Sequence, residues 1–194
     1  MQNISLIIQS ITHIYIQKIR PCAAEELSWF AQQPTLKSGV EFSALAMNRE
    51  GKRYSHQRRL KKATLEKAKE ILLANLGELK KSQSFDDLFL LIEKLLQPIN
   101  GAGELYIYDT ALRIGANMNL LPTKIYLHAG TRVGARALGF NTKCRVIEKQ
   151  DLPLDFKDLE PHEIEDVLCI FKSELEKVDL NSIRDNILDK SWCR

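Results

Sequence analysis

Hydrophobic residues recur along most of this chain at the three- and four-residue spacing of amphipathic helices. The clearest helix is expected over residues 85–96, where Ser84 is a good N-cap and acidic residues occupy the first turn. The same reasoning places further helices over residues 23–32, 63–81, 106–117, 131–138, 161–178 and 181–190. The pattern therefore predicts a mainly α fold.

Three stretches show a weaker hydrophobic periodicity. Residues 4–19 are apolar and rich in β-branched side chains, so a helix is expected there and a strand stays possible. Residues 34–39 are expected to form a turn, and residues 40–47 a helix or a strand. Because strand signals are weak elsewhere and no internal repeat occurs, residues 1–194 are predicted to form a single compact helical domain.

Composition places the chain among ordinary globular proteins. It has 194 residues, of which 44% are hydrophobic and 27% charged. The four cysteines lie far apart in sequence, which excludes a CxxC redox motif or a zinc knuckle and suits a reducing compartment. The apolar N-terminal segment is too short and too polar to span a bilayer, and it does not resemble a signal peptide. We therefore expect a cytoplasmic protein with no membrane association, no cofactor and no bound metal.

The net charge of +3 hides an asymmetry along the chain. Residues 1–150 carry 22 Lys and Arg against 13 Asp and Glu, whereas residues 151–194 carry 6 against 12. A basic body with an acidic C-terminal segment suits a surface that binds a polyanion, with the acidic segment turned away. The alternative is that the acidic segment packs on the body and neutralises it.

The basic charge is densest between residues 49 and 62. Only Glu50 opposes a run of seven cations, which are Arg49, Lys52, Arg53, Arg58, Arg59, Lys61 and Lys62. Such a run is often no more than a solvated face, but its density favours contacts with the phosphates of a nucleic acid. Arg53, Arg58 and Arg59 are the residues expected to make these contacts.

Glycines recur along the segment from residue 95 to residue 140. An apolar helix end leads into Gly101-Ala102-Gly103, and a second helical pattern follows. Glycine lets the main chain adopt a positive φ and approach an anion closely, and the next helix adds its positive N-terminal end. Gly101 and Gly103 are therefore expected to direct N–H groups at a DNA phosphate, although many such turns only connect two helices.

A second candidate anion site begins at Gly130. The residues GTRVGAR place a threonine and two arginines at a helix start, without the GK[ST] ending of a P-loop. We expect Thr131, Arg132 and Arg136 to contact phosphates, unless Thr131 is an ordinary helix cap.

Residues 99–139 resemble the helix–hairpin–helix DNA glycosylase superfamily. Gly101-Ala102-Gly103 matches the family's L-P-G-hydrophobic-G turn, and Asp109-Thr110-Ala111 is similar to its Lys-Thr-Ala triplet. Pro122-Thr123-Lys124, IYLHAG and GTRVGARALG then correspond to the family's return turn, its V-D-T-H segment and its Arg-rich helix. The resemblance implies an all-α fold, binding of duplex DNA and excision of a modified or damaged base.

The chain departs from the family at the residues that carry its chemistry. Asn100 replaces the proline of the turn, and extra residues separate Gly103 from Thr110. Asp109 stands where the lyase-competent members have lysine, and His128 stands where the family has its catalytic aspartate. No iron–sulfur cysteine cluster follows. The match therefore supports the fold and DNA binding more than the family's chemistry.

Asp109 and His128 are the candidate catalytic residues. Base excision needs a carboxylate that stabilises an oxocarbenium-like sugar and helps to activate water, and Asp109 is a lone acid in an apolar helix. Its alternative role is an ion pair with Arg113 at i+4. His128 lies in an apolar run, so it is either a general acid or base or a hydrogen-bonded core residue. Three tyrosines are expected to stack on a flipped base, unless they belong to the core: Tyr106, Tyr108 and Tyr126.

An acidic helix near the C-terminus offers a reserve carboxylate. His162, Glu165 and Asp166 follow Pro161 at i, i+3 and i+4 spacing, so they share one helix face. They either hold a metal or supply a carboxylate, or the acids only complement the helix dipole. If this helix folds back over the hairpin, Glu165 or Asp166 is expected to replace the missing catalytic aspartate.

Residues 95–140 are thus predicted to hold the hairpin and the active site, and residues 151–194 an acidic helical segment. The leading hypothesis is a DNA glycosylase that excises a modified or damaged base from duplex DNA. One alternative is a non-catalytic helix–hairpin–helix module that only binds DNA. Another is a protein that binds RNA or nucleotide phosphates through the two glycine-rich sites.

Overall fold

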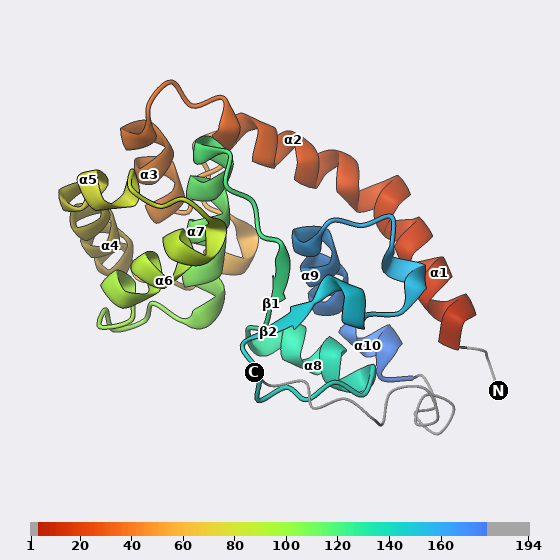
Figure 1. Cartoon of the computed structure of the whole chain (residues 1–194). Helices are drawn as coiled ribbons and strands as arrows, with labels where there is room; N and C mark the ends of the chain where they lie inside the picture. The colour runs from red at the N-terminus through yellow and green to blue at the C-terminus, as the bar shows by residue number, and fades with distance from the viewer. Residues whose placement is uncertain (1–3, 178–194) are drawn as a thin grey trace. The chain divides into compact units, whose positions relative to one another are not determined.

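The computed structural model describes residues 4–177 and is mainly α, as the sequence predicts (Figure 1). The chain divides into two compact units. Within the described residues, unit 1 comprises residues 4–21 and 123–177, and unit 2 comprises the intervening residues 22–122. Nothing in the hydropathy pattern marks these boundaries, and the first of them lies inside a helix. The helix expected over residues 181–190 lies outside the described residues.

The N-terminal helical segment runs without a break from Ile4 to Ala31. It consists of α1 (Ile4–Ile14), the π-helical turn η1 (Tyr15–Ile19) and α2 (Arg20–Ala31). Pro21 explains the change of helix type, because proline lacks the N–H that would bond the carbonyl four residues earlier and a π-turn absorbs this loss. The helix expected over residues 4–19 is confirmed.

Unit 2 is built from short helices. They are α3 (Leu36–Ala44), η2 (Ser55–Gln57), α4 (Lys62–Ala74), α5 (Leu76–Leu79), α6 (Phe85–Leu96) and α7 (Glu104–Met118). A capping box of Thr35 and Ser38 starts α3 inside residues 34–39, so the turn predicted there is wrong. The helix predicted over residues 63–81 divides at Asn75, whose side chain donates to the Ile71 carbonyl at 2.8 Å.

The rest of unit 1 combines helices with a small sheet that the sequence analysis missed. Strands β1 (Lys124–Tyr126) and β2 (Val146–Glu148) pair antiparallel, with Ile125 opposite Ile147. The other elements are α8 (Ala129–Ala137), η3 (Lys149–Asp151), η4 (Leu154–Phe156), α9 (Pro161–Ile170) and α10 (Lys172–Leu175). Strands of three residues are too short to show a clear alternation of polar and apolar positions.

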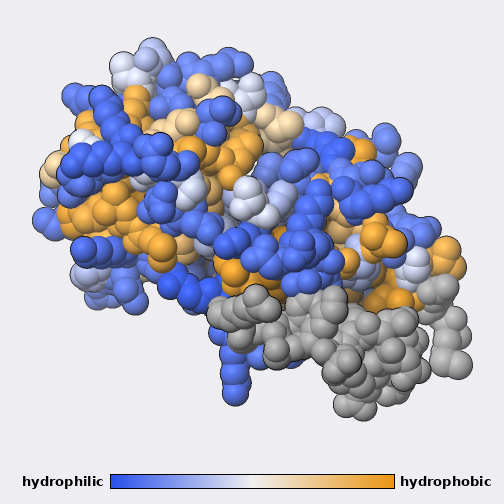
Figure 2. All heavy atoms as spheres, viewed as in Figure 1, coloured by the Kyte–Doolittle hydropathy of each residue, from blue (hydrophilic) through white to orange (hydrophobic). Residues whose placement is uncertain are grey.

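Each unit has its own hydrophobic core. Buried residues of unit 2 include Phe30, Val40, Leu65, Leu72, Leu88, Ile92 and Ile114. The core of unit 1 includes Ile8, Ile11, Tyr15, Ile125, Leu127, Leu138, Phe156 and Ile164. Hydrophilic side chains cover much of the face seen in Figure 2, with smaller hydrophobic patches between them. The helices within residues 4–177 include no candidate for a membrane span.

Candidate functional site

The predicted hairpin is present in unit 2. Residues 97–103 connect α6 to α7, and Gly101 adopts a φ of +91°, a conformation that residues with a side chain rarely adopt. The Thr64 hydroxyl of α4 donates to the Asn100 carbonyl at 3.0 Å, so the turn is held in place by a second helix. Gly101 and Gly103 are both exposed, as a contact with DNA requires.

The hairpin leaves main-chain donors open to a ligand. The Gly101 N–H bonds no acceptor within the described residues, whereas the Gly103 N–H bonds the Gly101 carbonyl at 3.1 Å. Gly103 is also the N-cap of α7, which begins without a side-chain cap. The 15 residues of this helix add a partial positive charge at the same end. The hairpin is therefore able to hold an anion.

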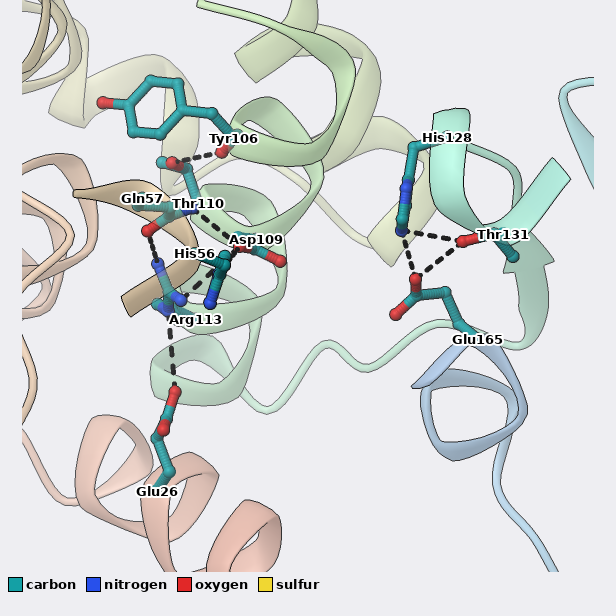
Figure 3. Close-up of polar contacts among 10 residues, drawn as sticks. All are labelled: Glu26, His56, Gln57, Tyr106, Asp109, Thr110, Arg113, His128, Thr131 and Glu165. Atoms are coloured by element: carbon teal, nitrogen blue, oxygen red, sulfur yellow. Dashed lines mark hydrogen bonds and ion pairs between the residues drawn. The ribbon is translucent and has the colours of Figure 1, made fainter. Parts of the chain in front are cut away.

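Asp109 lies in α7, less than two helical turns beyond the hairpin. Three side chains contact its Oδ2 oxygen, namely His56 Nε2 at 2.8 Å, Gln57 Nε2 at 2.7 Å and Arg113 Nη2 at 3.6 Å (Figure 3). The Oδ1 oxygen receives no hydrogen bond from the part of the chain that the structure describes. The side chain is 14% exposed, so Asp109 combines a fixed orientation with partial access to solvent.

Arg113 is the buried partner of this carboxylate. Its side chain is 6% exposed, and its Cζ lies 3.9 Å from the centroid of the Tyr54 ring. Its Nη1 donates to Gln57 Oε1 at 3.1 Å, and its Nε lies 3.9 Å from Glu26 Oε1. Burial raises the pKa of Glu26, and the charge of Arg113 opposes that rise. The i,i+4 ion pair expected between Asp109 and Arg113 is confirmed.

His56 and Gln57 complete this cluster, and the sequence analysis did not assign them to it. Both belong to η2, in the middle of the basic run. Gln57 is buried, whereas the His56 side chain is 45% exposed and its ring stacks on Tyr54. The sequence holds only one hint, which is a histidine among many cations. A short polar turn has no periodicity that would aim it at α7.

His128, the other predicted catalytic residue, belongs to unit 1 and has its own partners. It is the N-cap residue of α8 and is 2% exposed. Its Nε2 contacts Glu165 Oε1 and the Thr131 hydroxyl, the latter at 2.7 Å (Figure 3). Thr131 also donates to Glu165 Oε1 at 2.8 Å. The structure therefore pairs His128 with Glu165 and Asp109 with His56, each within one unit.

The basic run of residues 49–62 is largely exposed. Arg58 and Arg59 are open to solvent, whereas Arg53 is half-buried and donates to the Leu60 carbonyl at 2.9 Å. A pocket of about 450 Å³ is lined by Leu45, Met47, Gly51, Arg53, Arg58, Lys62, Leu65 and Glu66. Its three cations suit a ligand that carries phosphate.

The second predicted anion site is only partly accessible. Thr131 is fully buried and bonded to His128 and Glu165, so its side chain is not presented to a ligand. Arg136 is exposed and Arg132 is half-buried. Both arginines contact Thr142, Arg136 at the hydroxyl (3.4 Å) and Arg132 at the carbonyl (3.3 Å). These two side chains stay candidates for phosphate contacts.

The three tyrosines expected to stack on a base are all buried. Tyr106 and Tyr108 belong to the core of unit 2, and Tyr126 lies in β1 of unit 1. The Tyr106 hydroxyl donates to the Ala44 carbonyl at 2.6 Å, and burial raises its pKa. This agrees with the alternative that aromatic residues at helical spacing form a core.

The acidic side chains of α9 are divided among separate partners. Pro161 occupies the first turn as expected, behind a capping box formed by Glu160 and Glu163. Three of the acids make the following contacts: Glu163 with Arg20 at 2.6 Å, Glu165 with His128, and Asp166 with the Tyr15 hydroxyl at 2.8 Å. The reserve carboxylate Glu165 is thus part of a buried cluster.

His162 is expected to make stability depend on pH. Its Nδ1 is buried without a hydrogen-bond partner, and burial lowers its pKa below the usual 6.5, against the raising effect of Glu163 and Glu160. Because the unfolded chain then binds the proton more readily, the free energy of unfolding is expected to fall as the pH drops below 6.5. Urea unfolding from about pH 7.5 to about pH 5 measures this slope. His162→Gln should make this slope shallower, whereas His13→Gln, at an exposed position of α1, should not. Equal slopes in all three proteins would contradict the assignment.

Comparisons with protein-family models, with curated proteins and with solved structures find no match to this chain. Its function therefore has to be inferred from the geometry of its own residues. The hairpin and the Asp109 cluster of unit 2 carry most of that information.

Proposed function

We propose that this protein binds duplex DNA through the hairpin of unit 2 and excises a modified or damaged base by hydrolysing the N-glycosidic bond. The observation that carries the proposal is the placement of Asp109. Its carboxylate follows an open glycine hairpin by less than two turns of helix, one of its oxygens is held by three side chains, and the side chain is 14% exposed. A catalytic carboxylate needs this combination of orientation and access.

The proposed reaction depends on stabilising the positive charge that develops as the glycosidic bond breaks. As the base leaves with the electrons of the glycosidic bond, positive charge develops on the sugar, and a fixed carboxylate stabilises it. Asp109 Oδ1 takes that role. Because an ionised carboxylate only accepts hydrogen bonds, His56 donates from Nε2 at 2.8 Å, which leaves Nδ1 to accept a proton from the attacking water. Arg113 and Gln57 act as positioning residues, since they hold Oδ2.

Binding to DNA is proposed to use the main chain and exposed cations. The Gly101 N–H and the N-terminal end of α7 would contact one phosphate, and Arg58 and Arg59 would contact neighbouring ones. Contacts of this kind fix the position of the protein without reading sequence, and they make the affinity fall with added salt. The target base has to be flipped out of the duplex before Asp109 reaches its sugar.

A base-release assay tests the proposal. Duplexes that carry a panel of damaged and naturally modified bases, including phage-type modified cytosines, are incubated with the protein and then treated with alkali, which breaks strands at abasic sites. Breaks are expected on at least one modified substrate and not on unmodified duplex. Glu70→Gln, which alters an exposed carboxylate of α4, is the control and should behave like the native protein.

A second candidate function is DNA binding without catalysis. The observation in its favour is the buried Arg113, because an ion pair between Asp109 and a guanidinium stacked on Tyr54 is also what a purely structural network contains. Salt-sensitive binding with no strand breaks on any substrate would establish this function. Stronger binding to single-stranded RNA than to duplex DNA would instead favour the RNA-binding alternative.

A further inference from the structure

Unit 1 contains a buried cluster of metal-ligating side chains that the proposed reaction does not use. His128 is the N-cap of α8, and Glu165 and Cys169 stand at i and i+4 on one face of α9. One imidazole nitrogen, one carboxylate oxygen and the thiol sulfur all lie within 4.8 Å of one another. His128 and Glu165 are buried and Cys169 is half-buried, so this is not an acidic patch on the surface.

The charge of this cluster favours a bound cation. Glu165 is 4% exposed, and its partners within residues 4–177 are the Thr131 hydroxyl and His128. A buried carboxylate is costly unless a positive charge compensates it. Either a protonated His128 or a bound metal ion supplies that charge. The thiol favours the metal, because an ion pair between imidazolium and carboxylate has no need of a sulfur beside it.

Because Gly130 has no side chain, the Cys169 thiol and the His128 imidazole can both lie close to the first turn of α8. A Cβ at this position would lie 2.6 Å from the Cys169 sulfur and 3.5 Å from His128 Cε1. The first turn of α8 therefore contributes only backbone at this point, and the thiol and the imidazole approach it closely. Thr131 orients the carboxylate by donating to Glu165 Oε1 at 2.8 Å, as hydrogen-bond partners of metal ligands commonly do.

We propose that His128, Glu165 and Cys169 bind a divalent cation of the zinc type. Imidazole, carboxylate and thiolate are the ligands that zinc takes in proteins, and a mixed set that includes sulfur disfavours magnesium and calcium. The ion replaces the direct contact between His128 and Glu165, and the Cys169 thiol loses its proton to solvent on binding. Water or the Thr131 hydroxyl fills the fourth position. The site ties α8 to α9 and does not rest on the function proposed for unit 2.

Titration with Co²⁺ tests this site, because Co²⁺ occupies zinc sites and its bond to a thiolate gives a charge-transfer absorption band. The full-length protein, freed of metal with a chelator, is expected to bind a single equivalent of Co²⁺ with this band. Addition of Zn²⁺ should remove the band and raise the melting temperature. Cys169→Ser should abolish the band and weaken binding by at least about tenfold. Cys22→Ser, which changes an exposed cysteine of α2, should leave both unchanged.

Two outcomes would overturn the proposal: no thiolate band in the native protein, or a band that persists in Cys169→Ser. Should Cys169→Ser fail to fold, Glu165→Gln decides the question. The thiolate band should remain in this variant while the affinity for Co²⁺ falls by at least about tenfold. An unchanged affinity for Co²⁺ would show that Glu165 is not a ligand and would contradict the proposed site.

Discussion

Replacing Arg113 by methionine is expected to lower the free energy of unfolding by about 3–5 kcal/mol. The guanidinium is 6% exposed and contacts the carboxylate of Asp109, the amide of Gln57 and the ring of Tyr54. Methionine fills similar volume but supplies neither the charge nor the donors. Asp109 then loses its buried countercharge, and Gln57 Oε1 loses its donor, and these two uncompensated groups account for the main part of the expected loss.

Urea unfolding of four variants, which are Arg113→Met, Asp109→Asn, the double variant and Arg59→Met, separates this effect from a general effect of charge. Arg59→Met removes an exposed cation from the same unit and is expected to change stability by no more than about 0.5 kcal/mol. The double variant Arg113→Met, Asp109→Asn should lose less free energy of unfolding than the sum of its single variants, because the second change removes the carboxylate that has lost its countercharge. A loss of less than about 1 kcal/mol in Arg113→Met would contradict the role of Arg113 as a buried partner.

The second large effect is expected from Gly134→Ala in unit 1. Helix α8 approaches α9 so closely at this point that a Cβ on Gly134 would overlap the carbonyl oxygen of Leu168 and lie 2.8 Å from its carbonyl carbon. Backbone cannot swing aside as a flexible side chain can, so the two helices have to separate. We expect a loss of at least about 3 kcal/mol, which corresponds to a fall in melting temperature of about 6–12 °C.

Gly77→Ala is the matched control for this substitution. Gly77 lies in α5, and a Cβ there would meet no atom within 4 Å. Alanine also has the higher helix propensity, so Gly77→Ala should leave the melting temperature unchanged or raise it slightly. Equal melting temperatures for Gly134→Ala and the native protein would show that α8 and α9 are not in close backbone contact.

Local features of the fold could be predicted from the sequence because short-range rules determine them. Ser84 starts α6, and its hydroxyl oxygen accepts a hydrogen bond from the Asp87 N–H at 3.1 Å, as an N-cap residue should. The pair of Asp109 and Arg113 follows from helix geometry alone. The capping box at Thr35 was missed, because a serine takes the place of the usual Glu or Gln at its third position.

The candidate site could be predicted only in part, because its contacts join residues far apart in sequence. His56 contacts Asp109 across 53 positions, and His128 contacts Glu165 across 37. Periodicity assigns each residue to an element but does not state which elements pack together. A lone acid and a lone histidine in the same segment therefore appeared to be partners, whereas tertiary packing gives each of them a different one.

The rate of base release in two carboxylate variants tests the central claim most directly. On the substrate that the native protein cleaves, Asp109→Asn should slow single-turnover base release by at least about 100-fold while its affinity for DNA is retained. Glu165→Gln, which alters the buried carboxylate of unit 1, should keep the native rate. A folded Asp109→Asn variant that releases the base at the native rate, with Glu165→Gln inactive, would show that the chemistry does not depend on Asp109.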